Sequence, residues 1–524
     1  MRDFHLPGRS ATYASNGMCA TSHPLAAMTA IDILKAGGNA VDAAIAGAVL
    51  LGICEPQMTG IGGDCFMLIK PAGSDDVIAV NGSGRAPAGL SAATLRDAGH
   101  ATMPLYGNPA SVTLPGAIDA FCRVSADHGR FGIDRLLAPA IRYADEGVPV
   151  APRVAFDWFD DVATLSGDAR RFYLIDGAPP KPGQVFRAPG QAEVLRRIAA
   201  KGRDGFYAGE VAEDMVASLT AHGGTHTMAD FAAVSCDYTT PISGTYHGIE
   251  LLEHPPNGQG ATAILLLNIL SHFNLGAMDP MGAMRAHIEA EAAKLAYDAR
   301  NRFLAEHSPR LDHMLSARTA EKLAALIDPA RAMPDPAPVS EAVHKDTILI
   351  TTVDRDGMAV SLIYSIFHGF GSGLASAKFG INFQNRGAGF TLKPGHPNEA
   401  GGGKRPMHTI IPGMIRKNGR VTMPFGVMGG AYQPNGHARF ITNMVDFGMD
   451  AQMAFDAPRS FGALGPMEVE RGYSDGVRAA LAGMGHHVQV PHVALGGAQA
   501  ILMDASGVLI GASDPRKDGC ALGY

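Results

Sequence analysis

Several features that define other protein classes are missing from this chain of 524 residues. No lysine- or arginine-rich run occurs and the formal net charge is −7, which argues against a nucleic-acid or membrane-surface partner. The longest apolar stretches are too short to cross a bilayer without a glycine or a charge. The N-terminus lacks the apolar core and the A-x-A site of a signal peptide, so we expect a cytoplasmic protein.

Cysteine is also scarce and has no pattern. The six cysteines form no C-x-x-C pair, and no histidine–cysteine cluster has the spacing of a zinc site. We therefore expect buried free thiols and no metal. The six positions are Cys19, Cys54, Cys65, Cys122, Cys236 and Cys520.

The residues that are abundant are typical of a globular α/β protein. The chain is 46% apolar and holds 64 glycines, enough for many tight turns. Periodicity predicts a strand at 18–21 and a strand at 65–69. It predicts helices at 25–35, 40–51, 131–147, 191–214, 261–270 and 287–303. Residues 311–338, rich in alanine and proline, predict a solvated, flexible approach to the stretch around residue 346.

A glycine-rich motif, Thr59 to Asp64, invites a phosphate-loop interpretation. It lacks the lysine of a P-loop, and a strand rather than a helix is predicted directly after it. We therefore expect a scaffold turn here and no nucleotide.

The decisive stretch begins at Asp346-Thr347. Residues 348–353 are β-branched and apolar, 354–357 predict a turn, and 358–366 form a second apolar run, so a β-hairpin is predicted. On spacing alone, a threonine at the mouth of a strand is more simply a packed strand residue.

The wider pattern changes that balance. Thr347, the turn at 353–357, Tyr364-Ser365 and the F-G-S-G run at 370–373 occur in the order seen in γ-glutamyltransferases, which this chain resembles over nearly its whole length. Further matching stretches are 36–44, 60–66, 111–116, 426–430 and 511–516. The resemblance implies an N-terminal-nucleophile (Ntn) hydrolase that cuts itself between Asp346 and Thr347.

That cut would serve catalysis. A threonine hydroxyl is a weak nucleophile and needs a base. Cleavage before Thr347 frees an α-amino group whose pKa lies near 8, so it can accept the hydroxyl proton near neutral pH. Because the nucleophile supplies its own base, no cofactor is expected.

The resemblance also implies a fold and a chain organisation. The fold is α+β, a four-layer αββα sandwich formed by both processed chains. Residues 1–346 would be the large chain and 347–524 the small chain, interleaved in a single structural domain as an αβ heterodimer, with further dimerisation left open.

The family's catalytic pattern is kept at three further positions. Ser365 stands where a threonine hydroxyl touches the nucleophile; a buried turn-forming serine is an equal alternative from sequence alone. Gly429 and Gly430 match the glycine pair whose N–H groups face the tetrahedral oxyanion.

The substrate-binding positions depart from the family. Phe367 replaces an asparagine, and Gly389 replaces the aspartate that pairs with the α-ammonium of glutamate. Arg386 replaces a polar residue and could hold a carboxylate in a bidentate pair. A surface arginine is the alternative for Arg386.

Two further segments also differ from the family's sequence pattern. Ser83 replaces the arginine that holds the substrate α-carboxylate, leaving Arg85 as the only nearby arginine. His408-Thr409 replaces a serine pair and can still donate hydrogen bonds. The segment 394–404 is shorter than the lid-bearing loop of bacterial transferases, which predicts a more open site.

These changes favour an amide substrate whose acyl group carries a carboxylate and lacks the α-ammonium, with water or an amine as acceptor. Glutaryl-cephalosporin acylases and oxamate amidohydrolases are branches of the family that resemble this chain in these substrate-binding residues. One alternative is a true γ-glutamyltransferase or glutathione hydrolase that binds the substrate's α-amino group with other residues. Another is an unprocessed binding protein without catalysis.

Overall fold

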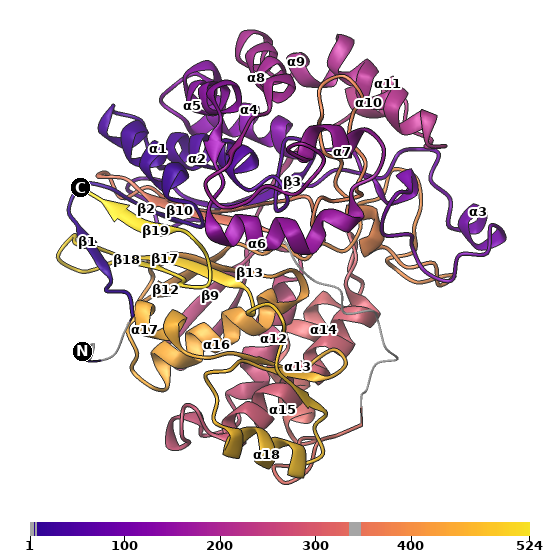
Figure 1. Cartoon of the computed structure of the whole chain (residues 1–524). Coiled ribbons are helices and arrows are strands. Elements are labelled where there is room, and N and C mark those ends of the chain that lie inside the picture. The colour runs from indigo at the N-terminus through magenta and orange to yellow at the C-terminus, as the bar shows by residue number, and fades with distance from the viewer. Residues whose placement is uncertain (1–4, 6–7, 335–346) are drawn as a thin grey trace.

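Two seven-stranded sheets pack face to face, and helices cover the outer face of each (Figure 1). We describe a computed structural model, in which residue 5 and residues 8–334 and 347–524 are placed well enough to describe. The order of layers is helix, sheet, sheet, helix. The predicted four-layer α+β sandwich is confirmed.

Strands from both ends of the chain and from its middle alternate within each sheet. The first sheet runs β19 (Cys520–Gly523), β2 (Met18–Thr21), β10 (Ile348–Val353), β11 (Ala359–Ser365), β3 (Asp64–Lys70), β4 (Ile78–Gly82) and β7 (Asp237–Thr239). The second runs β1 (Thr12–Ala14), β18 (Leu509–Ser513), β17 (Gly497–Met503), β13 (Arg420–Met428), β12 (Gly413–Lys417), β9 (Ile249–Glu253) and β8 (Ile242–Tyr246). All pairings within these two sheets are antiparallel.

The helical layer over the first sheet begins with α1 (Pro24–Lys35) and α2 (Ala40–Cys54). Every residue of α2 is buried, which its run of alanine and aliphatic side chains allows, and a capping box between Asn39 and Asp42 starts it. The same layer contains α4 (Ala117–His128), α5 (Ile133–Glu146), α8 (Pro189–Lys201) and α10 (Gly209–Ala221). In the view of Figure 1, α6 (Pro152–Asp161) appears at the level of the two sheets.

The opposite layer is built around α12 (Gly260–Leu270) and α13 (Ala283–Phe303). It is completed by α14 (Leu311–Leu315), α15 (Ala317–Ala324), α16 (Gln433–Val445), α17 (Ala451–Asp456) and α18 (Asp475–Gly483). Shorter helices elsewhere are α3 (Ala92–Asp97), α7 (Asp168–Tyr173), α9 (Asp204–Tyr207) and α11 (Met228–Ala232), and the minor strands are β5 (Val148–Pro149), β6 (Val185–Phe186), β14 (Ser460–Phe461), β15 (Met467–Val469) and β16 (Val488–Gln489).

The predicted hairpin lies in the middle of the first sheet. β10 pairs with β11 from Ile348↔Tyr364 to Val353↔Ala359, β10 also pairs with β2, and β11 pairs with β3. Both strands are fully buried. The start of the predicted small chain is therefore held from both sides by strands of the predicted large chain.

Two predicted segments differ from the structure. The single helix expected at 191–214 is broken into α8, α9 and α10, because Gly202 and Gly209 adopt left-handed conformations with φ of 59° and 60°. The expected flexible approach at 311–338 begins instead with α14 and α15, whose Met314 and Ala320 are fully buried.

The remaining expectations concern cysteines and membranes. All six cysteines are free thiols, four of them buried and Cys122 and Cys520 partly exposed. Within the described residues, no helix combines the length and the apolar character that crossing a bilayer requires.

Candidate active site

Thr347 lies directly before β10, at the end of the sheet where β10, β11 and β3 meet. Its side chain is buried, and its Oγ1 lies 3.3 Å from Ser365 Oγ at the end of β11. Asp346, the other side of the proposed cut, lies outside the described residues. The structure thus brings together the two hydroxyls that the sequence analysis singled out.

Close backbone packing fixes the position of Ser365. A Cβ on Gly63 would come within 2.4 Å of the Ser365 carbonyl oxygen, and a Cβ on Gly62 within 2.1 Å of the Asn382 carbonyl oxygen. Only glycine fits at these distances. The glycine motif at 59–64 is therefore a packing element beneath the site, as expected.

Arg386 is the central cation of the site. Its side chain is fully buried, Nη2 donates to Ser365 Oγ at 3.3 Å, and Nη1 donates to Thr409 Oγ1 at 2.9 Å. Its Nε is buried and has no hydrogen-bond partner among the described residues. Burial lowers the pKa of Arg386 to about 9, so the group remains a cation at neutral pH.

Phe367 covers this guanidinium. Its ring centroid lies 4.1 Å from the Arg386 guanidinium carbon, a cation–π contact. Its backbone adopts φ of 82°, which is rare for a bulky residue, and its N–H donates to Ser365 Oγ at 2.9 Å. Phe367, Arg386 and Thr347 therefore converge on one serine oxygen.

Asp64 is the carboxylate behind Arg386, and sequence reasoning missed it. Its Oδ1 accepts from the backbone N–H groups of Gly84 (2.9 Å) and Gly116 (3.1 Å) and from Gln384 Nε2 (2.9 Å). Burial raises the pKa of Asp64 to about 6, although the charge of Arg386 opposes that rise.

His408 supports Asp64 rather than touching Thr347. Its Nε2 lies 3.3 Å from Asp64 Oδ2, and its Nδ1 accepts from the Ile410 N–H at 3.3 Å. Burial, followed by the charge of Arg386, holds the pKa of His408 well below its ordinary value. A neutral imidazole with its proton on Nε2 satisfies both contacts.

The glycine pair lies at the end of β13. Gly429 and Gly430 adopt φ of 120° and 56°, conformations that favour glycine, and α16 follows them. The Gly430 carbonyl accepts from Gln259 Nε2 at 2.9 Å, and Gln259 also donates to the Thr409 carbonyl at 2.6 Å. Gln259, in turn held by Arg300 at 2.9 Å, thus links the two sides of the site.

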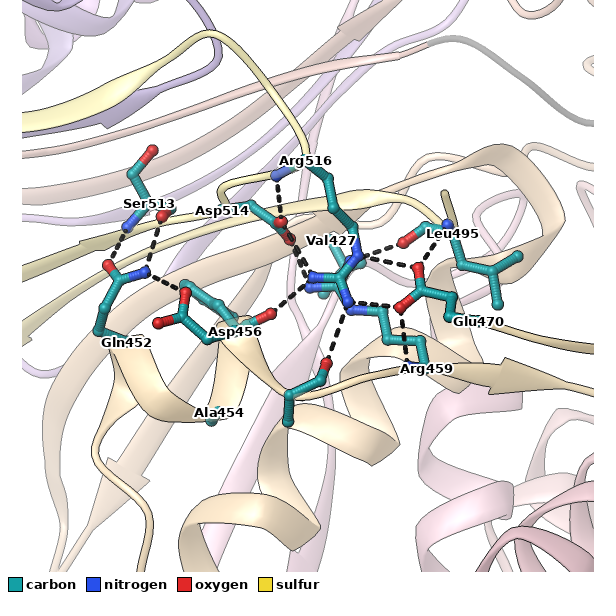
Figure 2. A network of polar contacts seen from close by, with 12 residues as sticks. Val427, Gln452, Ala454, Asp456, Arg459, Glu470, Leu495, Ser513, Asp514 and Arg516 are labelled. Atoms are coloured by element: carbon teal, nitrogen blue, oxygen red, sulfur yellow. Dashed lines mark hydrogen bonds and ion pairs between the residues drawn. The ribbon is translucent and has the colours of Figure 1, made fainter. Parts of the chain in front are cut away.

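A buried ionic network, drawn in Figure 2, holds the backbone of Leu495, and the backbone next to it packs on the glycine pair. A Cβ on Gly496 would come within 2.5 Å of the Met428 carbonyl oxygen, so the Leu495-Gly496 backbone packs directly on Met428-Gly429. The Leu495 N–H donates to Glu470 at 2.9 Å and its carbonyl accepts from Arg459 at 2.6 Å.

The remaining members of the network, Arg516 and Asp514, neutralise the charges of Glu470 and Arg459. Arg516 binds Glu470 through two nitrogens and Asp514 through a third contact, and Asp514 also binds Arg459. The backbone N–H and the carbonyl of Leu495 are therefore both held by a paired cluster of two arginines and two carboxylates.

Two cavities border this arrangement. The smaller, about 490 Å³, is lined by Thr347 and Gly429 together with Tyr432, Gly496 and Lys517. The larger, about 870 Å³, is lined by Phe367, Gly389 and Thr409 and by residues of the 391–398 segment. The predicted nucleophile and one of the two predicted oxyanion-binding glycines therefore line one cavity, and the predicted acyl-binding positions Phe367 and Thr409 line the other.

Comparison with known proteins identifies the family to which this chain belongs. The family model for gamma-glutamyltranspeptidase matches residues 26–524. The chain belongs to the γ-glutamyltranspeptidase family. It is an enzyme of that family, as the sequence predicted.

Three members of the family are especially similar. A glutathione hydrolase-like YwrD proenzyme of Bacillus subtilis is 33% identical, over 97% of this chain and 98% of its own. An oxamate amidohydrolase proenzyme of Klebsiella pneumoniae is 34% identical, over 98% of this chain and 100% of its own. The crystal structure of a cephalosporin acylase from Bacillus halodurans superimposes with a TM-score of 0.92 and 38% identity, covering 100% of this chain and 99% of the other.

Arg85 lies apart from this family's site. It is partly exposed, forms an ion pair with Glu306 at 2.6 Å and donates to the Gly403 carbonyl at 2.9 Å. Ser83, where the family pattern has an arginine, is buried and bonds Asn81 and Asn257. Among the predicted binding positions, Arg386 and Phe367 meet at Ser365. Thr409 accepts from Arg386, and Arg85 has no described contact with these residues.

The described residues include one group of three potential metal ligands, His287, Glu291 and His486. His287 Nδ1 and His486 Nε2 lie 2.8 Å apart, Lys294 donates to Glu291 at 2.8 Å, and the Met333 N–H donates to the other Glu291 oxygen at 2.7 Å. These ligand atoms are used in a buried hydrogen-bond network. The expectation that the enzyme needs no metal stays a prediction.

Proposed function

We propose that this family member is an autoprocessed amidohydrolase in which Thr347 is the nucleophile. The 3.3 Å contact between the Thr347 and Ser365 hydroxyls supports this role. The names of the relatives as proenzymes support cleavage at Asp346–Thr347, which would free the amine that acts as base.

The proposed reaction has two halves. Thr347 Oγ1 attacks the amide carbonyl while the freed α-amine accepts its proton, and the amine leaving group takes a proton as the C–N bond breaks. Water then attacks the acyl-threonine ester and releases the acid. In both halves the negative oxygen would face the N–H groups at Gly429 and Gly430.

The substrate we propose carries a carboxylate on its acyl group and lacks an α-ammonium. The observation that carries this is Arg386, a buried cation whose hydrogen bonds go to two hydroxyls and whose Nε has no described partner. The charge of Asp64 acts on it, but the two groups do not form a hydrogen-bonded ion pair. A buried charge is costly unless it is paired. A substrate carboxylate would supply the missing partner in bidentate geometry.

The surroundings favour an anion over an ammonium group. Among the described residues of the larger cavity, Asp298 is the carboxylate, and it is paired with Arg302 at 2.9 Å. Gly389, at the family's ammonium-binding position, lines the cavity without a side chain. A free α-amino group in this cavity would therefore find no unpaired anion among these described lining residues.

The test compares oxamate, glutaryl-p-nitroanilide and γ-glutamyl-p-nitroanilide on the processed enzyme. We expect hydrolysis of the substrates without an α-ammonium, and loss of about 100-fold in kcat/KM on Arg386→Leu, since one hydrogen-bonded charge contributes about 1.5–3 kcal/mol. Arg142→Leu, at an exposed site on α5, is the matched control. Preference for the γ-glutamyl compound would contradict this assignment and favour a γ-glutamyltransferase.

A further inference from the structure

The smaller cavity is distinct from the positions proposed to hold the acyl group. Thr347 and Gly429 line the smaller cavity, whereas Phe367 and Thr409, which both contact Arg386, line the larger one. The acyl and amine substituents of an amide carbonyl point in different directions from the carbon that Thr347 attacks. An acyl group whose carboxylate lies at Arg386 therefore directs the amine half of the substrate into the smaller cavity.

The lining of the smaller cavity is largely apolar. Every residue from 489 to 496, from the end of β16 to the start of β17, lines it, and Val493 and Leu495 are buried there. Two aromatic residues, Tyr432 and Phe461, line it as well, with their rings edge to face and the centroids 5.5 Å apart. Its volume of about 490 Å³ lies in the range of sites for small organic molecules. An amine with an apolar body would bury its surface against this lining, whereas ammonia would use almost none of it.

The outer edge of the same cavity is apolar too. Val490 lines the cavity and is 43% exposed. His492 also lines it, and its ring centroid lies 5.7 Å from that of Phe156, a residue of α6 that is 41% exposed. Exposed apolar side chains that gather beside a cavity are typical of a binding groove.

The charged groups around this cavity balance one another. Arg153 and Lys517 line it, and both form ion pairs with Asp157, at 2.8 Å and 3.3 Å. Glu468 lines it too. Apart from the imidazole of His492, these groups carry no net charge, so they offer a charged amine no net attraction and leave the apolar surface to select the substrate.

From these contacts we infer that the smaller cavity binds the leaving amine, and that the preferred substrates are amides of amines with an apolar or aromatic body. The inference rests on the proposed function, because it assumes that Thr347 attacks and that the acyl carboxylate lies at Arg386. It adds the chemistry of the amine half, about which the proposed function says nothing.

The test uses oxalic and glutaric monoamides of three similarly basic amines, ammonia, glycine and 2-phenylethylamine, so that differences between them report binding. In the acyl series that the processed wild-type enzyme hydrolyses faster, we expect kcat/KM for the phenylethyl amide to exceed that of the other two at least 10-fold. Val490→Trp fills the outer part of the cavity and should reduce this ratio to less than 3-fold. Val185→Trp, at a valine of β6 that is 41% exposed and does not line the cavity, should keep the wild-type ratio.

The outcomes separate this inference from the proposed function. Hydrolysis of the primary amide as fast as that of the phenylethyl amide, or a preference for the glycine amide, would overturn the inference and leave the proposed function standing. Hydrolysis of none of the amides by fully processed enzyme would overturn both. An unchanged ratio in processed Val490→Trp would overturn the placement of the amine in the smaller cavity.

Discussion

Ser365 Oγ lies 3.3 Å from Thr347 Oγ1 and accepts hydrogen bonds from the Phe367 N–H and from Arg386. One serine oxygen therefore connects the proposed nucleophile with the proposed carboxylate-binding group. If that oxygen matters, removing it should affect both self-cleavage and turnover.

Ser365→Ala tests this connection. The change leaves the buried Phe367 N–H and one Arg386 donor without an acceptor, so we expect self-cleavage to slow and kcat to fall about 10- to 100-fold. Ser365→Thr keeps the oxygen and should stay within a few-fold of wild type. Band ratios on a denaturing gel and steady-state kinetics measure the two effects, and a fully active alanine variant would contradict the role assigned to Ser365.

The ionic network behind the glycine pair leads to a second prediction. Glu470→Gln keeps the shape but removes a charge from the group that holds the Leu495 N–H. We expect kcat to fall about 10-fold with KM nearly unchanged, because the backbone proposed to bind the oxyanion would contribute mainly in the transition state. The exposed Glu213→Gln is the control. A change in KM alone would indicate that the network shapes the substrate pocket instead.

Asp64 predicts a dependence of stability on pH. Its pKa in the folded protein, about 6, lies above its ordinary value of 3.8, so the folded state binds the proton more tightly than the unfolded state. Its contribution is fully present below pH 3.8 and is lost as pH rises through about 6, a difference of about 3 kcal/mol.

The measurement is the Tm of wild type and of Asp64→Asn across this pH window. The Tm of the variant minus that of wild type should become more positive from pH 4 to pH 7, since asparagine has no charge to bury. A difference that is constant with pH, or that moves in the opposite direction, would show that the Asp64 pKa is not raised.

The sequence could predict those parts of the site that depend on local patterns. The β10–β11 hairpin has β-branched runs around an aspartate–glycine turn, and these patterns predict its bounds within two residues. The single helix expected at 191–214 misses the break between α8 and α10, because a glycine inside a helical pattern can be tolerated. Only the backbone shows that Gly202 has a positive φ and ends α8.

Asp64 and Glu470 could not be recognised in the same way. The partners of Asp64 are Gly84, Gly116, Gln384 and His408, which lie on four segments far apart in the chain. No spacing in the sequence brings these groups together. The glycine motif that ends at Asp64 does match the family, and an acidic residue directly before an apolar strand is the signal that the sequence offers.

The most direct test of the account is the N-terminal sequence of the smaller chain in the mature protein. We predict two bands on a denaturing gel, with the smaller chain beginning T-I-L-I at Thr347, and a single uncleaved band for Thr347→Ala. An active wild-type enzyme that remains one chain, or whose smaller chain begins elsewhere, would leave Thr347 without its base and would contradict the mechanism proposed here.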